Sequence, residues 1–330
     1  MKYKYLKILP FVVVALFWSC SEKEIIEEPD DTIKEITATV NCIAIDKNNT
    51  KWIGTTDGLY KSITGGYELV ELSAPGKIYS LFYNESQNSL WIGTETGLLE
   101  AKIGSENWSE TAIPKEKLSN PKVLTIYKND NSGTWFGSEK GLSLNHGETW
   151  KKEKFRVNIQ NKLFVTEIEN YTINSISSWD GDYFFATSGA KLYRAFDYNA
   201  TVDAFSGATQ WDPPYNGTSI TDTMFVVFVD KTGKQWMGGT EGIQVHTGHD
   251  PKDLASFTYY SDELPDNYVL AINQAPNGDI WVGTRKGIGK FNGSQWQIIT
   301  AGLSELYITA IAFDKDGKAW IGTKKGLVSL

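Results

Sequence analysis

The stretch Trp52-Ile53-Gly54-Thr55-Thr56-Asp57-Gly58-Leu59 decides the fold, because it recurs along the chain. Five further copies keep the Trp, and a weaker copy has Phe in its place. The seven anchor residues are Trp52, Trp91, Trp135, Phe184, Trp236, Trp281 and Trp320. Neighbouring anchors are 39 to 52 residues apart. A repeat of about 20–50 residues indicates one continuous structure built from similar units.

An alternating apolar run precedes each anchor, as in residues 40–46 before the first one. Two columns of this run are apolar in all seven units. They lie three residues apart and therefore point to opposite faces of a strand. We therefore expect each run to be an inner strand that is buried on both faces. The first column holds Val40, Ile78, Val123, Ile173, Met224, Val269 and Ile308, and the second holds Ile43, Leu81, Ile126, Ile176, Val227, Ile272 and Ile311.

The rest of each unit contains the Trp strand, a third strand and a fourth strand that carries an aromatic residue. Four short strands per unit with this period are typical of β-propeller blades. The sequence therefore predicts an all-β protein, a seven-bladed β-propeller of four-stranded antiparallel blades over residues 38–330. The fourth-strand aromatics are Tyr67, Trp108, Trp150, Trp211, Phe257 and Trp296.

The seventh unit has no fourth strand after its third, because the sequence stops at Leu330. A strand from the other end of the chain would close the ring and remove an exposed edge. The two available segments are Lys23–Glu28 and Thr32–Thr37. Neither carries the aromatic residue of the other units, so a missing strand stays an alternative.

The first 19 residues are typical of a signal peptide. Lysines at positions 2, 4 and 7 precede an apolar run over residues 6–18, which is too short for a membrane-spanning helix of about 20 residues. Ser19-Cys20 then indicates a lipoprotein cleavage site with lipidation of Cys20. An ordinary secretory signal followed by an incidental Cys is the alternative. We expect residues 20–37 to be the lipidated Cys and an acidic tether, with room for the ring-closing strand.

Charge and cysteine content limit the partners. The net charge of −8 becomes −11 when residues 1–19, with their three lysines, are removed. An acidic body argues against nucleic acid as a partner and leaves the lipid anchor as the expected link to a membrane. Cys42 is the only other cysteine, so no internal disulfide is available. It lies in a column of small residues between the two apolar columns, and we expect a structural role.

Two stretches exceed the repeat and are candidate functional loops. In residues 155–170 the apolar residues alternate on both sides of Gln160-Asn161-Lys162, which predicts an extra hairpin. Residues 198–222 contain Asp212-Pro213-Pro214-Tyr215 beside the weak fourth unit. Trp211 and Tyr215 are aromatics that could stack on sugar rings, although Trp211 also fits a fourth-strand anchor.

The repeat resembles the two-component regulator propeller family. The resemblance rests on the Ile/Val-x-x-Ile run followed by Trp-Ile-Gly-Thr-x-x-Gly-Leu, and it covers residues from about 38 to 330. The unit at Phe184 departs from the pattern. Members of the family often form the periplasmic sensor half of membrane kinases that detect glycan fragments. The resemblance implies the propeller fold and a sensing role, here as a stand-alone lipoprotein of a gram-negative envelope, on either side of the outer membrane.

The turn between the second and third strands is the best place to look for a site. In propellers these turns meet the blade-to-blade loops on one face around the channel. Early turns are mostly acidic and the last two are basic, which predicts a face of split polarity that binds a polar ligand. Ordinary solvated turns are the alternative. The candidate ligand-binding residues are Asp57, Glu95, Glu139, Glu241, Arg285, Lys286, Lys324 and Lys325.

Signals for catalysis are few. The sequence His246-Thr247-Gly248-His249-Asp250 has too few ligands for a metal site and is interpreted as a solvated loop. No phosphate loop or dinucleotide motif indicates a cofactor, and we expect none. The sequence favours a non-catalytic module that binds a polar small molecule or glycan, or another envelope protein, in glycan sensing or uptake. The alternatives are a carbohydrate-active lyase or glycosidase with carboxylates at the channel mouth, and a structural scaffold of a surface complex.

Overall fold

Each copy of the Trp motif forms the second strand of a small antiparallel sheet in the computed structural model of the chain. The structure describes residues 35–104, 108–128, 133–153, 157–159, 162–164, 168–188, 192–199, 204–211, 214–215, 218–219, 223–248 and 254–330. These residues belong to the compact unit Thr32–Leu330. The predicted signal peptide, Cys20 and most of the predicted tether lie outside them.

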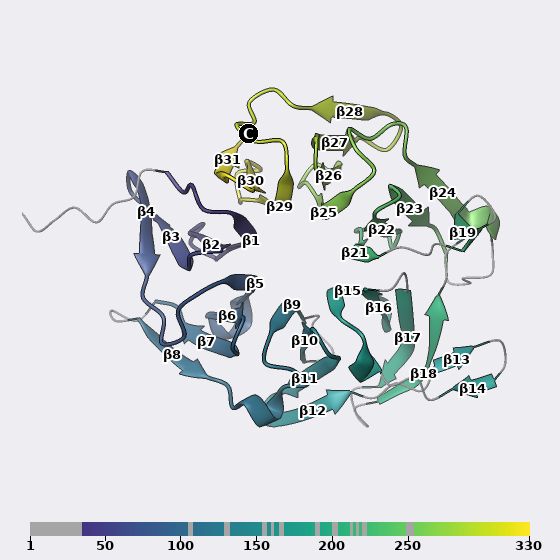
Figure 1. The fold of residues 1–330 in the computed structure, drawn as a ribbon, viewed down its shortest axis with the longest axis horizontal. Helices are drawn as coiled ribbons and strands as arrows, with labels where there is room; N and C mark the ends of the chain where they lie inside the picture. The colour runs from purple at the N-terminus through teal and green to yellow at the C-terminus, as the bar shows by residue number, and fades with distance from the viewer. Residues whose placement is uncertain are drawn as a thin grey trace, which may run out of the picture. The chain divides into compact units, whose positions relative to one another are not determined.

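Seven sheets are arranged around a ring and confirm the predicted seven-bladed β-propeller (Figure 1). The first three blades have four strands each, and the strands pair in chain order. Blade 1 comprises β1 (Val40–Ile45), β2 (Lys51–Thr55), β3 (Leu59–Ile63) and β4 (Gly66–Val70); blade 2 comprises β5 (Ile78–Asn84), β6 (Ser89–Thr94), β7 (Leu98–Lys102) and β8 (Ser109–Ala112); blade 3 comprises β9 (Val123–Lys128), β10 (Thr134–Ser138), β11 (Leu142–His146) and β12 (Thr149–Glu153).

The next three blades follow the same order from the inner strand outward. Blade 4 comprises β15 (Ile173–Trp179), β16 (Asp182–Thr187), β17 (Leu192–Asn199) and β18 (Ala204–Trp211); blade 5 comprises β21 (Met224–Val229), β22 (Gln235–Gly239), β23 (Ile243–His246) and β24 (Phe257–Tyr260); blade 6 comprises β25 (Val269–Gln274), β26 (Ile280–Thr284), β27 (Gly287–Phe291) and β28 (Trp296–Ile299).

Blade 7 has three strands in the described part of the chain, β29 (Ile308–Phe313), β30 (Ala319–Thr323) and β31 (Gly326–Ser329). The predicted closing segment Lys23–Glu28 lies outside the described residues. Of the other predicted segment, residues 35–37 are described and form no strand. Ile36 is nevertheless buried, and it packs with Val40, Ile53 and Leu327.

The hairpin expected in residues 155–170 is present as β13 (Val157–Ile159) and β14 (Lys162–Phe164). Strand β13 pairs in parallel with β18, so the sheet of blade 4 has six strands. A two-stranded ribbon of β19 (Pro214–Tyr215) and β20 (Thr218–Ser219) follows, which places Tyr215 in a strand. Short 3-10 helices lie in the connections, at η1 (Glu85–Gln87), η2 (Lys115–Lys117), η3 (Ile168–Asn170) and η4 (Leu254–Ser256).

A glycine in the second strand sets the distance between blades. A Cβ on Gly54 would lie 2.7 Å from Cγ2 of Ile78, the first inner-strand residue of the next blade. Six glycines have this relation to the first apolar column of the following blade, and five of them form the pairs Gly54–Ile78, Gly137–Ile173, Gly238–Val269, Gly283–Ile308 and Gly322–Val40. Gly93 relates to Val123 in the same way. The fourth blade differs, because Ala186 takes the glycine position and packs with Met224.

The first apolar column is buried, with every member at most 3% exposed. In the second column Ile43 and Leu81 are only partly buried. The small residues between the columns face the glycines, since Cys42 pairs with Gly54 and a Cβ on that glycine would lie 2.5 Å from the Cys42 sulfur. Burial raises the pKa of the Cys42 thiol, which fits the structural role expected for this residue.

The anchors pack against the next blade. Trp91 lies 6.2 Å from Trp150 between ring centroids, and Trp236 lies 6.5 Å from Trp296. Five anchors are buried, whereas Trp281 and Trp320 are partly buried. The two exceptions belong to blades 6 and 7.

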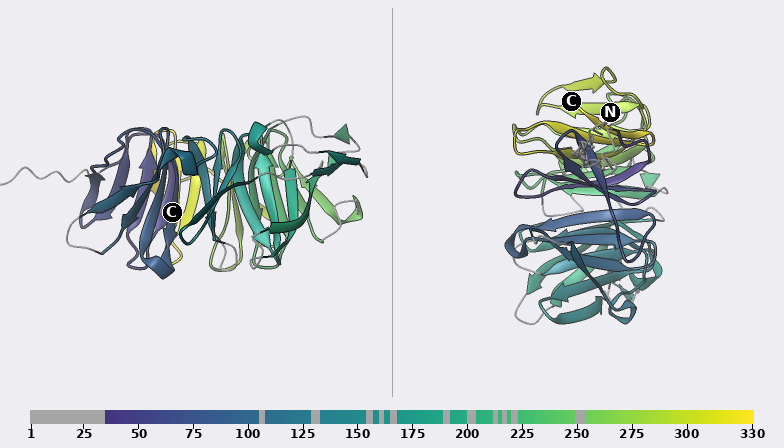
Figure 2. Two further views of the ribbon diagram at one scale, coloured as in Figure 1. Left: turned by 90° about the horizontal axis from the view of Figure 1, so that it is seen from below. Right: turned by 90° about the vertical axis from the view of Figure 1, so that its left-hand side faces the viewer.

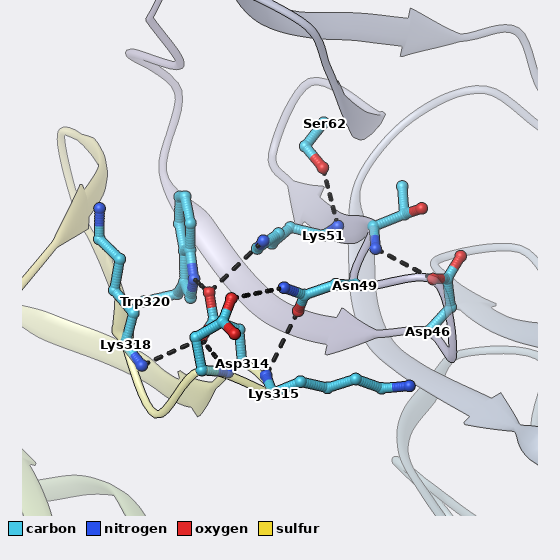
Figure 3. Close-up of polar contacts among 10 residues, drawn as sticks. Asp46, Asn49, Lys51, Ser62, Asp314, Lys315, Lys318 and Trp320 are labelled. Atoms are coloured by element: carbon cyan, nitrogen blue, oxygen red, sulfur yellow. Dashed lines mark hydrogen bonds and ion pairs between the residues drawn. The ribbon is translucent and has the colours of Figure 1, made fainter.

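An aspartate at the end of the inner strand holds three of these Trp residues. Asp314 accepts a 2.9 Å hydrogen bond from Nε1 of Trp320 and backbone N–H bonds from Asp316 and Lys318 (Figure 3). Asp46 binds Trp52 and Asp230 binds Trp236 in the same way. These aspartates were not singled out from the sequence, although they recur six residues before the Trp.

Blade 1 contacts blade 7 through apolar and polar groups, and these contacts close the ring. Lys51 lies 3.4 Å from the carboxylate of Asp314, and Asn49 donates a 3.2 Å hydrogen bond to Asp316. The Lys315 N–H donates back to Asn49, and the Thr309 hydroxyl donates to the Val40 carbonyl. Figure 3 shows most of these groups between the two blades.

The turns that connect the strands lie on two opposite faces of the ring, because neighbouring strands run antiparallel (Figure 2). We call the face with the turns between second and third strands, such as residues 55–58 and 323–326, the channel face. No helix in the described part of the chain is long and apolar enough to cross a membrane.

Candidate functional site

The Thr or Ser of the repeat motif builds the turns of the channel face. In blade 1 the Thr55 hydroxyl donates to the carbonyl of Gly58 at 2.9 Å and accepts the N–H of Asp57 at 3.1 Å. Thr94, Ser138, Thr284 and Thr323 make the same hydroxyl-to-carbonyl bond in their blades. This bond leaves the side chains between the Thr and the Gly outside the turn. All eight candidate ligand-binding residues lie in these turns, and all eight are exposed.

A connected group of charged and aromatic side chains joins blades 2 and 3. The Tyr79 hydroxyl donates a 2.6 Å hydrogen bond to Glu95. Lys122 binds Glu139 at 2.6 Å and lies 3.7 Å from Glu95, with its ammonium 5.0 Å from the centre of the Tyr79 ring. Lys77 lies 4.6 Å from the same ring centre. Two of the predicted acidic residues are therefore brought together by one lysine.

These contacts shift the pKa of three side chains in the group. The hydrogen bond from Tyr79, helped by Lys122, lowers the pKa of Glu95 below its ordinary value. The hydrogen bond to Glu139 raises the pKa of Lys122. Burial, and next the bond to Glu95, raises the pKa of Tyr79. At neutral pH these shifts favour the carboxylate of Glu95, the ammonium of Lys122 and the neutral phenol of Tyr79.

A second group lies between blades 5 and 6. Arg285 donates to both carboxylate oxygens of Asp266, at 2.9 and 3.3 Å, and Lys286 lies 3.5 Å from the same carboxylate. The Arg285 guanidinium also lies 4.4 Å from the centre of the Tyr268 ring, which contacts Phe225 at 4.7 Å. Burial alone would raise the pKa of Asp266, but the bonds from Arg285 and from the Tyr268 N–H hold it below its ordinary value.

Blade 7 contributes a third group. The ammonium of Lys324 lies 3.7 Å from the centre of the Tyr307 ring, and Lys325 binds Glu305 at 3.2 Å. The Tyr307 N–H, followed by Lys325, lowers the pKa of Glu305.

Two predicted residues stand apart from these groups. Asp57 accepts a 2.9 Å hydrogen bond from the hydroxyl of Thr56. Glu241 lines a small hollow of about 10 Å³ beside Gly239, which replaces the usual Thr or Ser of the turn.

The predicted difference in charge between the early and the late turns is smaller than the turn residues alone indicate. The acidic turns of blades 2 and 3 bind Lys122, and the basic turns of blades 6 and 7 bind Asp266 and Glu305. These partners come from the blade-to-blade connections, so each group is close to neutral. Tyr79, Lys122, Tyr268 and Tyr307 were not predicted, because they lie outside the turns between the second and third strands. A usable signal exists, because all four lie one residue before or after the first apolar column.

A groove of about 380 Å³ lies between blades 1 and 2 on the opposite face. Its lining includes Trp108 and Ile103, with Asn48, Lys61 and Lys102 as polar groups. Both lysines are engaged, because Lys61 binds Glu68 and Lys102 binds Glu100. The groove was not expected from the sequence.

The interpretation of residues 246–250 as a solvated loop is wrong for the first residue, His246. His246 is the last residue of β23 and is fully buried, with its Nδ1 2.5 Å from Oε1 of Gln235 and its ring 4.5 Å from Phe257. His249 lies outside the described residues. Among the residues that the structure describes, no three His, Cys, Asp or Glu side chains gather as metal ligands would.

Comparisons with known proteins agree on the fold. The model of the family described as two component regulator propeller matches residues 263–286 and 302–325. Among solved structures, the extracellular domain described as that of a putative hybrid two component system, BT3049 from B. thetaiotaomicron, is 18% identical with a TM-score of 0.69, covering 89% of this chain and 40% of that one. The extracellular domain of the putative one component system BT4673 from the same organism is 18% identical with a TM-score of 0.68, covering 92% and 40%.

A streptogramin B lyase is also similar, at 15% identity and a TM-score of 0.66, with 91% of this chain and 95% of the lyase covered. The chain thus spans about two fifths of the length of the two extracellular domains. No curated protein sequence matches the chain. At these identities the solved structures show the shared fold.

Proposed function

We propose that this chain is a non-catalytic binding module of the bacterial cell envelope. The match of residues 263–286 and 302–325 to the model of the two component regulator propeller family supports this proposal. The ligand of the chain is a polar small molecule or a glycan, or a polar surface of another envelope protein, and its role lies in glycan sensing or uptake. The extracellular location of the similar domains supports a position outside the cytoplasm. In this proposal Cys20 carries a lipid that anchors the chain in the outer membrane of a gram-negative bacterium.

One observation carries the binding proposal. Three tyrosine rings on the channel face, Tyr79, Tyr268 and Tyr307, each have a cationic side chain within 5.0 Å of the ring centre. A partly buried aromatic ring beside a charged hydrogen-bond donor suits a ligand with an apolar face and polar edges, as in a sugar ring. These residues come from blades 2, 6 and 7, and the site includes the predicted residues Glu95, Glu139, Arg285 and Lys324. Asp57 and Glu241 extend it around the channel.

Three carboxylates of the channel face support binding over catalysis. A glycosidase needs one carboxylic acid whose pKa is raised so that it can donate a proton. On the channel face the pKa of Glu95, Asp266 and Glu305 is instead lowered by their hydrogen-bond partners. The likeness to a streptogramin B lyase keeps a lyase as the second candidate. A scaffold in a surface complex is the third.

The test uses the chain from residue 21 in a glycan-binding array, followed by calorimetry and a turnover assay on each ligand found. We expect binding without turnover. The charge-reversal variants Arg285→Glu and Lys324→Glu should weaken binding at least tenfold. Lys231→Glu is the matched control, because Lys231 is an exposed lysine in the β21–β22 turn on the opposite face. Cleavage of any ligand would contradict the proposal and favour a lyase or glycosidase function. If all three variants bind the ligand with the affinity of the unmodified chain, the binding site lies elsewhere.

A further inference from the structure

The groove between blades 1 and 2 lies where the repeat departs from its aromatic pattern. In blade 6 the third-strand residue that follows the one opposite the Trp anchor is Phe291, and its partner on the fourth strand is Trp296. Both rings pack on Trp236 of blade 5, at 5.8 and 6.5 Å between ring centroids, and on each other at 5.1 Å. In blade 2 the same two positions hold Ala101 and Glu110.

The two rings that cover the anchor of blade 5 are therefore absent from these positions beside Trp52, the anchor of blade 1. Trp108, two residues before Glu110, provides one ring instead, with its centroid 5.6 Å from that of Trp52. The volume of the second ring is not replaced, because Ala101 has only a methyl group. The groove of about 380 Å³ occupies this junction.

The indole of Trp108 is fixed in place where it lines the groove. Its Nε1 donates a 2.9 Å hydrogen bond to Glu110, and the other oxygen of that carboxylate accepts the N–H of Ser73 at 2.6 Å. Trp52 supports the ring from within the blade junction. An aromatic ring held in one position in a groove of this volume suits stacking on the apolar face of a ring-shaped ligand.

Two lysines line the groove, Lys61 from blade 1 and Lys102 from blade 2. Each ammonium lies 3.1 Å from a carboxylate outside the lining, Glu68 for Lys61 and Glu100 for Lys102. Ion pairs at the protein surface contribute little to stability, because water screens them and the side chains lose freedom. An anion in the groove can therefore compete for both ammonium groups.

Asp46 is the one carboxylate among the described residues that line the groove, and its oxygens are already occupied. One oxygen accepts the N–H groups of Asn48 and Thr50, and the other accepts Nε1 of Trp52 at 3.1 Å. The side chain is also buried. An anionic group that enters the groove thus meets two cations and a carboxylate that is neutralised by its own hydrogen bonds.

We propose that this groove is a second ligand site, which binds a sugar ring that carries a carboxylate. Trp108 stacks on the apolar C–H face of the ring, and Lys61 and Lys102 bind the carboxylate. The Ser62 hydroxyl, which accepts a backbone N–H at 2.9 Å, donates its own proton to a sugar oxygen. The groove lies on the face opposite the channel-face site of the proposed function, so either site can be lost without the other.

Isothermal titration calorimetry of the full-length chain tests the ligand class. The probes are the disaccharides of galacturonate, glucuronate and mannuronate, each beside the neutral disaccharide of the same ring configuration and linkage. At least one acidic disaccharide should bind at least tenfold more tightly than its neutral counterpart, because only the acid engages the two lysines. Equal affinity within every pair, or no binding of any acidic disaccharide, would contradict the proposal.

Lysine variants then locate the binding. Lys61→Gln and Lys102→Gln should each weaken the acidic disaccharide at least fivefold and leave the neutral one unchanged. Lys290→Gln is the matched control, because Lys290 lies opposite the Trp anchor of blade 6 as Lys61 does in blade 1, and it forms a 2.9 Å ion pair outside the groove. Equal losses in all three variants would attribute the effect to the overall charge of the protein and overturn the proposal.

Two further variants separate the groove from the channel face. Trp108→Phe should weaken the acidic and the neutral disaccharide by the same factor and remove most of the change in tryptophan fluorescence on binding, and its melting temperature verifies that it folds. Arg285→Glu should leave the affinity unchanged. A loss confined to Arg285→Glu would assign the acidic sugar to the channel face, which would overturn the second site and leave the proposed function in place.

Discussion

Gly322 and Val40 meet where the last blade joins the first: a Cβ on Gly322 would lie 2.7 Å from Cγ1 of Val40 and 3.0 Å from Cβ of Ala310. The same close approach recurs at Gly283 with Ile308, so the contact is part of the repeat. It means that the two ends of the ring are joined by the same packing as internal neighbours. The fourth blade shows what an added methyl group requires, since Ala186 there faces the unbranched Met224.

We therefore expect Gly322→Ala to lower the free energy of unfolding by about 1–3 kcal/mol through overpacking. Adding Val40→Met should recover part of the loss, because an unbranched Cβ leaves room as it does beside Ala186. Gly97→Ala is the control, since a Cβ there meets no atom within 4 Å and the backbone is not in the left-handed region. Urea denaturation measures all three. A neutral Gly322→Ala would mean that the blades can move apart without cost.

The aspartate-to-tryptophan hydrogen bond separates two otherwise similar anchors. Trp236 donates to Asp230 at 2.9 Å, whereas the buried Nε1 of Trp91 has no acceptor among the described residues. Trp236→Phe should therefore cost about 1–3 kcal/mol more than Trp91→Phe, because it leaves a buried carboxylate one bond short. The loss of ring volume is common to both variants and cancels in the comparison. Chemical denaturation of the pair gives the difference, and equal losses would contradict the expectation.

Acid should weaken the ring through Asp314. Burial alone would raise the pKa of this carboxyl, but hydrogen bonds from Trp320, Lys318 and Asp316, together with Lys51, hold it below its ordinary value. A carboxyl whose pKa is depressed by folding stabilises the fold above its unfolded pKa, and this contribution is lost as the pH falls through the folded pKa. The free energy of unfolding should therefore fall between about pH 5 and pH 2.

The variant Asp314→Asn should be less stable than the parent at pH 7 by about 1.5–3 kcal/mol and should lose less on acidification. Asp316→Asn is the matched control, because Asp316 is exposed and its carboxylate accepts a 3.2 Å bond from Asn49. Urea curves at several pH values between 2 and 7 measure the slopes. If the free energy of unfolding falls equally with pH in the parent and in Asp314→Asn, then Asp314 does not cause the acid sensitivity.

Cys42 should resist alkylation in the folded protein. Its sulfur lies against Gly54 in the packing between blades 1 and 2, and burial raises the pKa of the thiol, so little reactive thiolate forms at pH 8. In a Cys20→Ser background, iodoacetamide should modify Cys42 at pH 8 only after denaturant is added. Mass spectrometry follows the reaction. Rapid modification without denaturant would show that the inner strands open readily.

The repeat made the fold predictable because the chemistry of each unit is local. Seven Trp or Phe anchors, the paired apolar columns and the turn glycines specify strand order without any long-range information. The weak unit at Phe184 was still placed correctly, since Phe184 is buried and Ala186 keeps the glycine position small.

The site was predictable only in part. The charged turns could be placed on one face, but their partners could not, because Lys122 and Asp266 belong to connections whose lengths vary between blades. Whether two opposite charges lie 3 Å or 10 Å apart depends on those connections and not on the motif. His246 illustrates the same limit, because its burial depends on Phe257 and Gln235, which lie on neighbouring strands.

Seven similar blades present any docking partner with seven nearly equivalent orientations. The hairpin of β13 and β14 removes this ambiguity, because it extends the sheet of blade 4 beyond the fourth strand at which the other complete blades end. The hairpin therefore distinguishes blade 4 from the other blades of the ring. A partner that binds this hairpin can dock in one orientation about the ring axis, although the repeat itself is nearly the same in every blade.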